Sequence, residues 1–427
     1  MVLLRRGREL YLLLLVFCFV GVALVSLKQS LPGHRSDAID ACLVFCVLFL
    51  TAHFALFLLS SESDQVLLPV ASLLSAIGIV FALRLAPSGS LAHKQLIWLG
   101  IGLALMLVTV KALEHYAVLR DYKYLAACTG IGLMGVTAVV GKEINGSRLW
   151  LGAGGFYFQV TEAMKLLLVL FLAGYLADRR LMLAAVSRRW RSFRVPTLPY
   201  LVPLVIIWGF TLALMAWQHD LGAMLLLMGV TLLMVYVATG RWAFVGAGLA
   251  VVVLNLFVAY HAFGYVRVRI DLWLHPLTQI HGAGYQIAQS IFAFAGGGVL
   301  GTGLGRGYPG FIPVVQTDFI FAAIGEELGT AGAFAIVGVY VVMAFRGLRI
   351  SVRQPADYGM LLAVGITAIL AVQSLVIMAG NMALIPITGI TLPFVSYGGS
   401  SIVVNFILIG FLLRLSTSRP APGVTRF

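Results

Sequence analysis

The sequence predicts an all-α polytopic membrane protein with about twelve transmembrane helices, and three observations support this fold class. Of the 427 residues, 61% are hydrophobic and only 11% are charged, whereas a soluble domain carries roughly 25% charged residues. Uncharged windows of about 20 residues, the length that crosses a bilayer, follow one another along the chain. Lysine and arginine concentrate in alternate loops between these windows. Together these features exclude a soluble globular domain.

Each transmembrane helix is predicted from an apolar window, and the absence of a Pro/Ser-rich linker between windows predicts one membrane domain. The twelve windows are roughly 10–27, 41–60, 65–84, 95–113, 123–141, 158–177, 198–217, 221–239, 242–262, 318–345, 359–380 and 393–414. The first window follows a basic start and so imitates a signal peptide. It ends in Ser26-Leu27-Lys28-Gln29 rather than in a small-residue cleavage site, so we interpret it as an uncleaved first span.

The basic residues predict the orientation of the chain. If the spans alternate sides from a cytoplasmic N-terminus, 18 of the 29 Lys and Arg residues fall in inside segments, 9 in outside segments and 2 within spans. This positive-inside pattern predicts that both termini are cytoplasmic. The net charge of +13 then follows from membrane topology. No nucleic-acid site is expected, because a basic face would need aromatic residues or a docking element beside it.

One outside segment is much longer than the others. Residues 263–317 form a large extracellular loop of about 55 residues, and a loop of this length is usually either functional or disordered. Its Trp273, Tyr285 and Phe292 favour an ordered, functional loop. Within it, 285–300 is apolar enough to pack on the membrane surface or to re-enter the membrane.

A second outside segment, 381–401, leads into the last predicted span. It mixes Pro386, Pro393 and three glycines with apolar residues. This composition predicts a broken or re-entrant entry into the span. Backbone of this kind is tolerated at membrane depth only where it is buried in protein or lines a cavity.

The cysteines predict neither disulfides nor a metal site. All four lie in apolar runs, where thiols behave as small buried hydrophobic groups. They are Cys18, Cys42, Cys46 and Cys128.

Charged residues in and near the sixth window are the first candidates for a functional site. Glu162 and Lys165 are three residues apart and share a helix face, so they can pair. Two interpretations remain open: a structural ion pair that fixes helix packing, or a pair that lines a wet cavity. Arg148 lies in the preceding outside loop, 145–152. Its guanidinium would match phosphate oxygens, or it would anchor the loop at the membrane interface.

The tight outside turn 218–222 contains a second carboxylate. Asp220 precedes an apolar run and is expected chiefly to cap the next helix. His219 is interpreted as an interfacial side chain, because no second His or Cys lies at metal-ligand spacing. The glycines of 296–307 imitate a dinucleotide-binding pattern, but no strand precedes them and no acid follows at the required distance. A flexible loop, or amides offered to phosphate, are the remaining alternatives.

Asp318 is the most informative residue, because an acid at the mouth of an apolar helix is costly unless something uses it. Ala322, Gly325 and Gly329 would share its helix face. They would form a small-residue stripe that leaves room for a partner helix or a ligand chain. Desolvation would raise the pKa of the Asp318 carboxyl, which suits a general base. The alternative is a helix cap formed by Thr317 or Asp318.

In combination, these motifs resemble the SEDS family (shape, elongation, division and sporulation), which comprises RodA/FtsW-like membrane proteins. The matching stretches are 145–165, 218–222, 284–307, 317–329 and 386–401. They fall within 65–416, which the resemblance makes the glycosyltransferase core with ten spans. The two spans in 1–64 are then additional at the N-terminus, and 417–427 is a cytoplasmic tail.

The resemblance implies a peptidoglycan glycosyltransferase at the outer face of the bacterial cytoplasmic membrane. Its implied substrate is lipid II, an undecaprenyl-pyrophosphate-linked disaccharide-pentapeptide. The family's essential aspartate corresponds to Asp318, implied to deprotonate the acceptor 4-hydroxyl while undecaprenyl pyrophosphate leaves. Positive charge for that leaving group is expected from Arg148, Lys165, Arg267, Arg269 and Arg306. The residues expected to bind substrate are Glu162, Lys165, Arg148, Gln159, Asp220, Thr317, Ser396, Tyr397 and Ser400.

The sequence departs from the family's pattern at three places. Gln316 stands where the family has a His before Thr-Asp, and glutamine cannot carry a charge in a proton relay. Val160-Thr161 replaces Pro-Ser, and His219 replaces Pro in the Gln-Pro-Asp-Leu-Gly turn. The last two are mild changes.

A class B penicillin-binding protein, a single-span transpeptidase, is the partner that the resemblance implies. A divalent cation, Mg²⁺ or Mn²⁺, is the only cofactor left open. Two other functions also remain open. A lipid II flippase would share the spans and the Glu162–Lys165 pair, but it would need no base and would form no polymer. A non-catalytic scaffold for a transpeptidase would tolerate substitution of Asp318 and Glu162.

Overall fold

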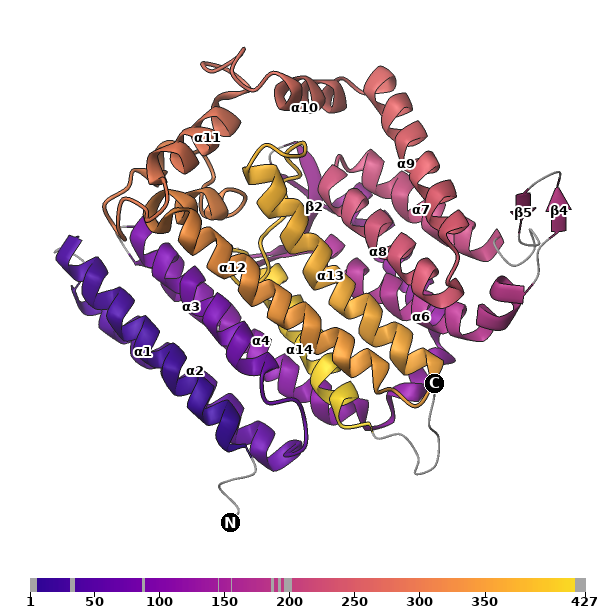
Figure 1. The fold of residues 1–427 in the computed structure, drawn as a ribbon, viewed down its shortest axis with the longest axis horizontal. Helices are drawn as coiled ribbons and strands as arrows, with labels where there is room; N and C mark the ends of the chain where they lie inside the picture. Colours follow the sequence, from indigo (N-terminus) through magenta and orange to yellow (C-terminus); the bar gives the residue numbers. More distant parts are fainter. Residues whose placement is uncertain are drawn as a thin grey trace. The chain divides into compact units, whose positions relative to one another are not determined.

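The computed structural model describes residues 6–30, 35–86, 89–144, 146–154, 156–185, 188–190, 193–195 and 202–418. The helices are α1 (Gly7–Ser30), α2 (Arg35–Leu59), α3 (Leu67–Leu85), α4 (Ser90–Ala112), α5 (Lys123–Val140), α6 (Val160–Ala185), α7 (Val202–Trp217), α8 (Leu221–Thr239), α9 (Trp242–Ala262), α10 (Gly264–Leu274), α11 (Tyr285–Gly297), α12 (Ile320–Val352), α13 (Asp357–Asn381) and α14 (Gly399–Ser416) (Figure 1). Two 3₁₀ helices, Leu113–Arg120 and Pro309–Phe311, lie between these α-helices. Most of the predicted tail, 419–427, lies outside the described residues.

The all-α polytopic fold class is confirmed. In the described part of the chain, eleven helices are long and apolar enough to cross a membrane. The seventh predicted window corresponds to α7, an apolar helix of only 16 residues. The segment 263–317 contains α10, α11 and a 3₁₀ helix, so the expectation of an ordered loop is also confirmed.

Two helix boundaries differ from the predicted windows. The last span begins at Gly399 rather than near 393, and the backbone before it is non-helical up to Gly398. The span after Asp318 begins at Ile320, and its helical geometry is interrupted at Gly329, where φ is 68° and ψ is −174°. Glycine adopts this conformation without the steric penalty that a Cβ would bring. The hydropathy of the sequence predicts the membrane span but not the interruption of its helix at Gly329.

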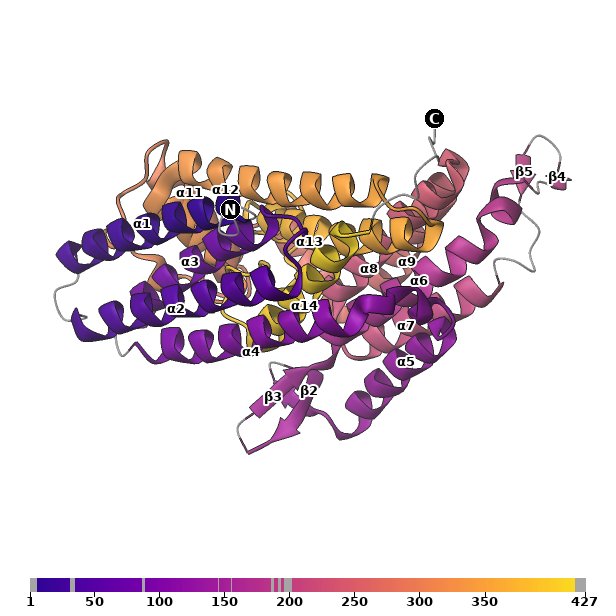
Figure 2. The same cartoon turned by 90° about the horizontal axis from the view of Figure 1, so that it is seen from below.

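The chain forms two compact units. The first comprises residues 1–112, 259–346 and 373–417, and the second comprises 113–258, 347–372 and 418–427. In the first unit, α14 packs along α4, and α1 and α2 pair beside α3 and α4 (Figures 1 and 2). Gly102 of α4 faces Phe406 of α14, and Gly410 of α14 lies against Thr109 of α4. Small residues at these points let the two helices approach closely.

A buried charge cluster fixes the N-terminal helix pair. Arg6 forms an ion pair with Glu9, and Glu9 Oε1 lies 2.6 Å from His53 Nδ1. The Arg6 guanidinium also donates to the Ser60 carbonyl and the Ser63 hydroxyl, each at 2.7 Å. Side chains that are buried away from water can stay charged when they are paired and hydrogen-bonded in this way. The cluster therefore ties α1 and α2 to the loop that precedes α3.

In the second unit, α6 is the central helix and packs against α5 and α8. Gly130 of α5 faces Met164 of α6, and Gly365 of α13 lies against Val169 of α6. A three-stranded antiparallel sheet of β1 (Lys142–Ile144), β2 (Ser147–Ala153) and β3 (Phe156–Gln159) links α5 to α6 (Figure 2). A second, two-stranded sheet is formed by β4 (Arg188–Trp190) and β5 (Phe193–Val195).

The expectation that the cysteines are buried is wrong, because none of the four is fully buried. Cys18 and Cys128 are exposed at the protein surface, and Cys42 and Cys46 are partly exposed. All four are free thiols. The apolar sequence around each cysteine therefore predicts a membrane helix, but it does not imply burial of the thiol inside the protein.

Candidate active site

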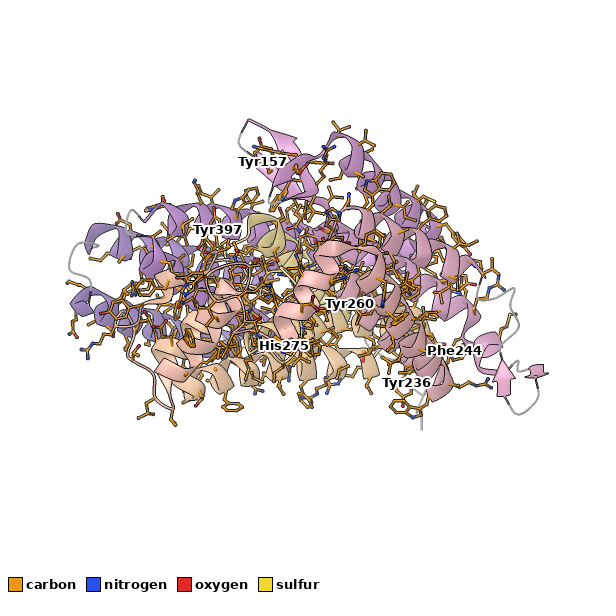
Figure 3. The ribbon with its side chains drawn as sticks, turned by 90° about the horizontal axis from the view of Figure 1, so that it is seen from above. Tyr157, Tyr236, Phe244, Tyr260, His275 and Tyr397 are labelled. Carbon is orange, nitrogen blue, oxygen red and sulfur yellow. The ribbon has the colours of Figure 1, made fainter. Side chains whose placement is uncertain are left out.

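Asp318 lies at the start of α12, where hydrogen bonds to backbone carbonyls fix the chain. The amide of Tyr397 donates to the Gln316 carbonyl at 2.8 Å, and the Ser396 hydroxyl donates to the Thr317 carbonyl. The segment before α14 therefore contacts the two residues that precede Asp318. Tyr397, labelled in Figure 3, is half-buried.

Asn381, the last residue of α13, completes this arrangement. Its side-chain amide donates to the Asp318 carbonyl at 2.7 Å, and its Oδ1 accepts from the Ala322 amide at 3.3 Å. The Asn381 carbonyl in turn accepts from the Ser290 hydroxyl of α11 at 2.6 Å. The Ala322 amide also donates to the Phe319 carbonyl at 3.0 Å, so Asn381 supplies the first turn of α12 with an additional acceptor from another helix. Three successive carbonyls, those of residues 316–318, are thus each held by a separate donor.

The helix cap that the sequence predicts for α12, formed by Thr317 or Asp318, is not found in the structure. The Thr317 hydroxyl donates to the Val314 carbonyl at 3.1 Å, and in the first turn of α12 the Ala322 amide donates to the Asn381 side chain. Capping by Thr317 or Asp318 is therefore wrong. The Asp318 carboxylate does not fold back onto its own helix, and this leaves it available to other groups.

The surroundings of the Asp318 carboxylate favour its neutral form. The side chain is partly exposed, and desolvation by the surrounding protein raises the pKa of the carboxyl. The Thr317 hydroxyl and the positive charge of Arg269 oppose that rise. Gly389, with φ +70°, faces the carboxylate: a Cβ at that position would lie 3.8 Å from Asp318 Oδ2. A glycine here leaves space in front of the acid.

Arg269 reaches this region from α10. Its guanidinium donates to the Ile387 carbonyl at 3.3 Å, and the Trp273 indole, one turn further, donates to the Ala383 carbonyl at 3.0 Å. The helix is thus fixed to the segment that follows α13. Among the outer cations predicted to serve the leaving group, the structure places Arg269 within electrostatic range of Asp318.

The predicted small-residue stripe on α12 is not an open groove. Ala322 is fully buried, and a Cβ on Gly325 would lie 2.3 Å from the Phe294 ring of α11. Gly329 interrupts the helix and does not continue a regular face. The stripe exists because α11 packs against it, so the expectation of room for a ligand chain there is wrong.

The glycine-rich segment after α11 uses its amides internally. Those of Thr302 and Gly303 donate to the carbonyls of Glu326 and Glu327, each at 3.0 Å. The Gly305 amide donates to the Glu327 carboxylate at 2.9 Å. The phosphate-binding alternative is wrong for these three amides, because each already has a partner.

In the second unit, Glu162 and Lys165 form the predicted ion pair. Lys165 Nζ lies 2.5 Å from Glu162 Oε2, and both side chains are nearly fully buried. Asp220 is also buried, and it caps α8 as predicted by accepting from the Ala223 amide at 3.0 Å. Burial raises the pKa of the Asp220 carboxyl, Ala223 and Thr161 lower it, and the charge of Glu162 raises it further.

The remaining candidates of this unit lie on its sheet. Arg148 of β2 pairs with Glu143 of β1 at 3.1 Å, and both side chains are about half exposed (54% each). Gln159 ends β3 opposite Trp150 of β2. A pocket of about 180 Å³ lies beside the sheet, lined by Ala138, Glu143, Gly146, Arg148, Trp217, Gln218 and His219. His219 has φ 61° and contacts the Gly146 carbonyl at 3.3 Å.

The predicted site residues thus form two groups, one in each unit. Within the first unit it brings together Asp318, Thr317, Ser396 and Tyr397, and Ser400 is buried in the first turn of α14. Within the second, Glu162, Lys165 and Asp220 lie close to one another, and Arg148 and Gln159 occupy the sheet. Sequence reasoning missed Asn381. The only signal was a polar amide at the end of an apolar run, which is too common to single it out.

The fold and the site together define a polytopic membrane protein with a partly exposed carboxylate at a helix start. A family model described as cell cycle protein, covering FtsW, RodA and SpoVE, matches residues 55–420. This chain belongs to that family. The resemblance inferred from the motifs is therefore confirmed.

Several relatives extend this result. The chain is 37% identical over 438 residues to "Peptidoglycan glycosyltransferase RodA" of Mycobacterium tuberculosis, covering 99% of this chain and 92% of the relative. It is 37% identical over 331 residues to "Stage V sporulation protein E" of Bacillus subtilis, covering 76% and 86%. A solved chain from a peptidoglycan synthase complex that coordinates polymerization and crosslinking superposes with a TM-score of 0.71 and 26% identity, covering 83% and 97%.

Proposed function

We propose that this chain polymerises lipid II at the outer face of the bacterial cytoplasmic membrane, with Asp318 as the general base. The chain is a peptidoglycan glycosyltransferase of the FtsW/RodA/SpoVE family and a multi-pass membrane protein. The observation that carries the assignment of the base is the environment of Asp318. It is a partly exposed carboxyl with a raised pKa, its own carbonyl is held by Asn381, and the carbonyls of the two preceding residues are held by Ser396 and Tyr397.

The proposed reaction is a single displacement. The Asp318 carboxylate takes the proton of the 4-hydroxyl on the acceptor sugar. The resulting oxygen attacks the anomeric carbon of the donor, the bond from that carbon to the pyrophosphate oxygen breaks, and undecaprenyl pyrophosphate leaves with the electron pair. The Asp318 carboxyl must be ionised to accept the proton. Its raised pKa makes the ionised carboxylate a stronger base.

Positive charge is needed where the pyrophosphate departs. Arg269 is the candidate in the first unit, because its charge already acts on Asp318. In the second unit, we propose Arg148 as a phosphate contact, since its guanidinium is about half exposed. Lys165 is nearly fully buried against Glu162, so a direct contact with substrate would require that ion pair to open. Gln159 and Asp220 remain proposals as substrate contacts.

Ser396 and Tyr397 are proposed to act on the substrate through Asp318. The Ser396 hydroxyl donates to the Thr317 carbonyl, and the Tyr397 amide donates to the Gln316 carbonyl. Ser400 is buried at the start of α14 and supports the same segment. These residues and Thr317 would set the direction of the Asp318 carboxylate toward the acceptor.

A divalent cation remains a proposal. In the described residues, no group of three or more His, Cys, Asp and Glu side chains is placed to hold one. Mg²⁺ is commonly bound by one or two carboxylates together with substrate phosphates. Asp318 could supply one such ligand, and substrate and water would have to supply the rest.

We further propose that the chain works beside a class B penicillin-binding protein. The supporting observation is that the solved relative belongs to a peptidoglycan synthase complex that coordinates polymerization with crosslinking. The two N-terminal helices, with most of their length before the matched residues 55–420, are proposed to be an addition to the catalytic core.

The direct test compares the purified protein with Asp318→Asn, using lipid II as substrate and gel separation of the polymer. Loss of a general base is expected to lower the rate by roughly 10²–10⁴-fold. Normal polymerisation by Asp318→Asn would show that the base is assigned wrongly. Lipid II translocation without polymer from the unmodified protein would favour a flippase, and tolerance of both Asp318→Asn and Glu162→Gln would favour a scaffold.

A further inference from the structure

Four large apolar side chains are exposed in a segment that belongs to no membrane-spanning helix. This segment, 298–311, is the first part of the connection between α11 and α12. Its exposed side chains are those of Val299 (70%), Leu300 (83%), Tyr308 (72%) and Phe311 (62%). The rings of Tyr308 and Phe311 lie side by side, with centroids 6.1 Å apart. Exposed apolar side chains that gather in one segment usually mark contact with another apolar phase.

The segment 298–311 is fixed against the interruption in α12. The amides of Thr330 and Ala331, just after Gly329, donate to the carbonyls of Gly298 and Val299 at 2.9 and 3.1 Å. Glu326 accepts from the Tyr308 amide at 2.7 Å. These bonds add to those from residues 302, 303 and 305 described above. The exposed side chains therefore have a defined position in the molecule.

A partly buried ion pair sets the level of this segment relative to the membrane. Arg84, in the last turn of α3, donates to Glu327 Oε1 at 2.9 Å and to the Gly307 carbonyl at 2.8 Å. Because α3 is a membrane span that ends at Leu85, residues bonded to Arg84 lie at the membrane boundary. Figures 1 and 2 both show α11 and the following loop at this end of α3 and α12.

The exposed surface also continues the lipid-facing side of a span. Val299 is hydrogen-bonded to Ala331, and Phe334, within one turn of Ala331, is 75% exposed on α12. Tyrosine is enriched where a membrane meets water, since it has an apolar body and a polar tip. Arg306, in the same segment, is exposed and carries a positive charge suited to lipid phosphates. This combination of residues is suited to a lipid surface.

We infer that the segment 298–311 inserts Val299, Leu300, Tyr308 and Phe311 into the outer leaflet of the bilayer, at the headgroup and upper acyl region. The occupant of this surface is lipid. The insertion holds α12 at the lipid surface around Gly329, through the bonds to residues 326–331. Its consequence for catalysis rests on the proposed function: it would keep Asp318 at a fixed height relative to a pyrophosphate carried on a lipid.

Spin-label accessibility tests this inference without any turnover. Leu300→Cys is made in a chain whose four native cysteines are replaced by serine, labelled with a nitroxide, and reconstituted alone in phosphatidylethanolamine–phosphatidylglycerol vesicles. Phe334→Cys is the lipid-facing control. Glu62→Cys, exposed in the loop between α2 and α3, is the aqueous control. Molecular oxygen partitions into lipid and a nickel chelate stays in water.

The expected result is that the label at position 300 is reached several-fold better by oxygen than by the nickel chelate, as at position 334. Nickel accessibility equal to that at position 62 would overturn the inference. Protection from both reagents would overturn it too, because a second copy of the chain would then cover the surface. A preparation that fails to polymerise lipid II but gives the oxygen-accessible result would contradict the proposed function alone.

Discussion

The first and second units hold their candidate carboxylates in different ways. Asp318 is fixed through its backbone, where Asn381 holds its carbonyl, and the carboxylate itself faces the space beside Gly389. Glu162 is fixed through its charge, because it is buried in an ion pair with Lys165. A carboxylate held by its backbone remains free to exchange a proton with a ligand. A carboxylate paired with a buried cation can bind a ligand only if that ion pair opens.

The largest expected effect concerns the stability of the second unit. Lys165→Met would leave the Glu162 charge buried without its cation, and breaking a buried pair in this way costs about 3–5 kcal/mol. The double variant Glu162→Gln/Lys165→Met should recover most of that loss. Thermal or denaturant unfolding in detergent measures both. Asp318→Asn, by comparison, should change the unfolding free energy little while removing activity. Equal destabilisation by Lys165→Met and Asp318→Asn would remove the distinction between the two sites.

The second prediction tests whether Asn381 positions Asp318. Asn381→Leu keeps the approximate size of the side chain but removes both hydrogen bonds. Because displacement of a catalytic group by about 1 Å can lower a rate by roughly 10²-fold, kcat should fall by about 10–100-fold with a smaller change in KM. Steady-state polymerisation of lipid II provides both constants.

A matched control is available on another membrane helix. Asn255 of α9 is exposed and donates within its own helix, to the Val251 carbonyl at 2.9 Å, so Asn255→Leu should leave kcat unchanged. Asn381→Leu should also keep the acidic limb of the pH–rate profile near its original pH, since Asn381 contacts backbone atoms. A fall in folded protein that accounts for all lost activity would instead give Asn381 only a structural role.

These predictions also separate what the sequence supplies from what it does not. The helices, the Glu162–Lys165 pair and the Asp220 cap are local in sequence, so hydropathy and helix spacing suffice to predict them. The donors to residues 316–318 come from Asn381, Ser396 and Tyr397, more than 60 residues away, and only the fold brings them together. The α12 stripe left two alternatives open for the same reason, because small residues fit a ligand and a packed helix equally well, and the structure shows the packed helix, α11.

The third prediction concerns the pH dependence of polymerisation. The positive charge of Arg269 lowers the pKa of Asp318 against the stronger effect of burial. Arg269→Gln should therefore raise that pKa, and since the base is active only above its pKa, the acidic limb of kcat/KM should move to higher pH. Arg267→Gln is the control, because Arg267 contacts the Tyr260 and His261 carbonyls. An unmoved limb in Arg269→Gln, or an equal shift in both variants, would contradict this electrostatic role.

The smallest expected effect is at Arg148, and it separates a substrate contact from a surface ion pair. The Arg148–Glu143 pair is half exposed, so breaking it should change stability by only about 0–1 kcal/mol. If Arg148 binds phosphate, Arg148→Gln should raise KM for lipid II several-fold. Glu143→Gln breaks the same ion pair but leaves the guanidinium in place, so it should not raise KM. Equal increases in KM for both variants would show that the pair matters through the shape of the sheet, because each variant removes that pair but only one removes the cation.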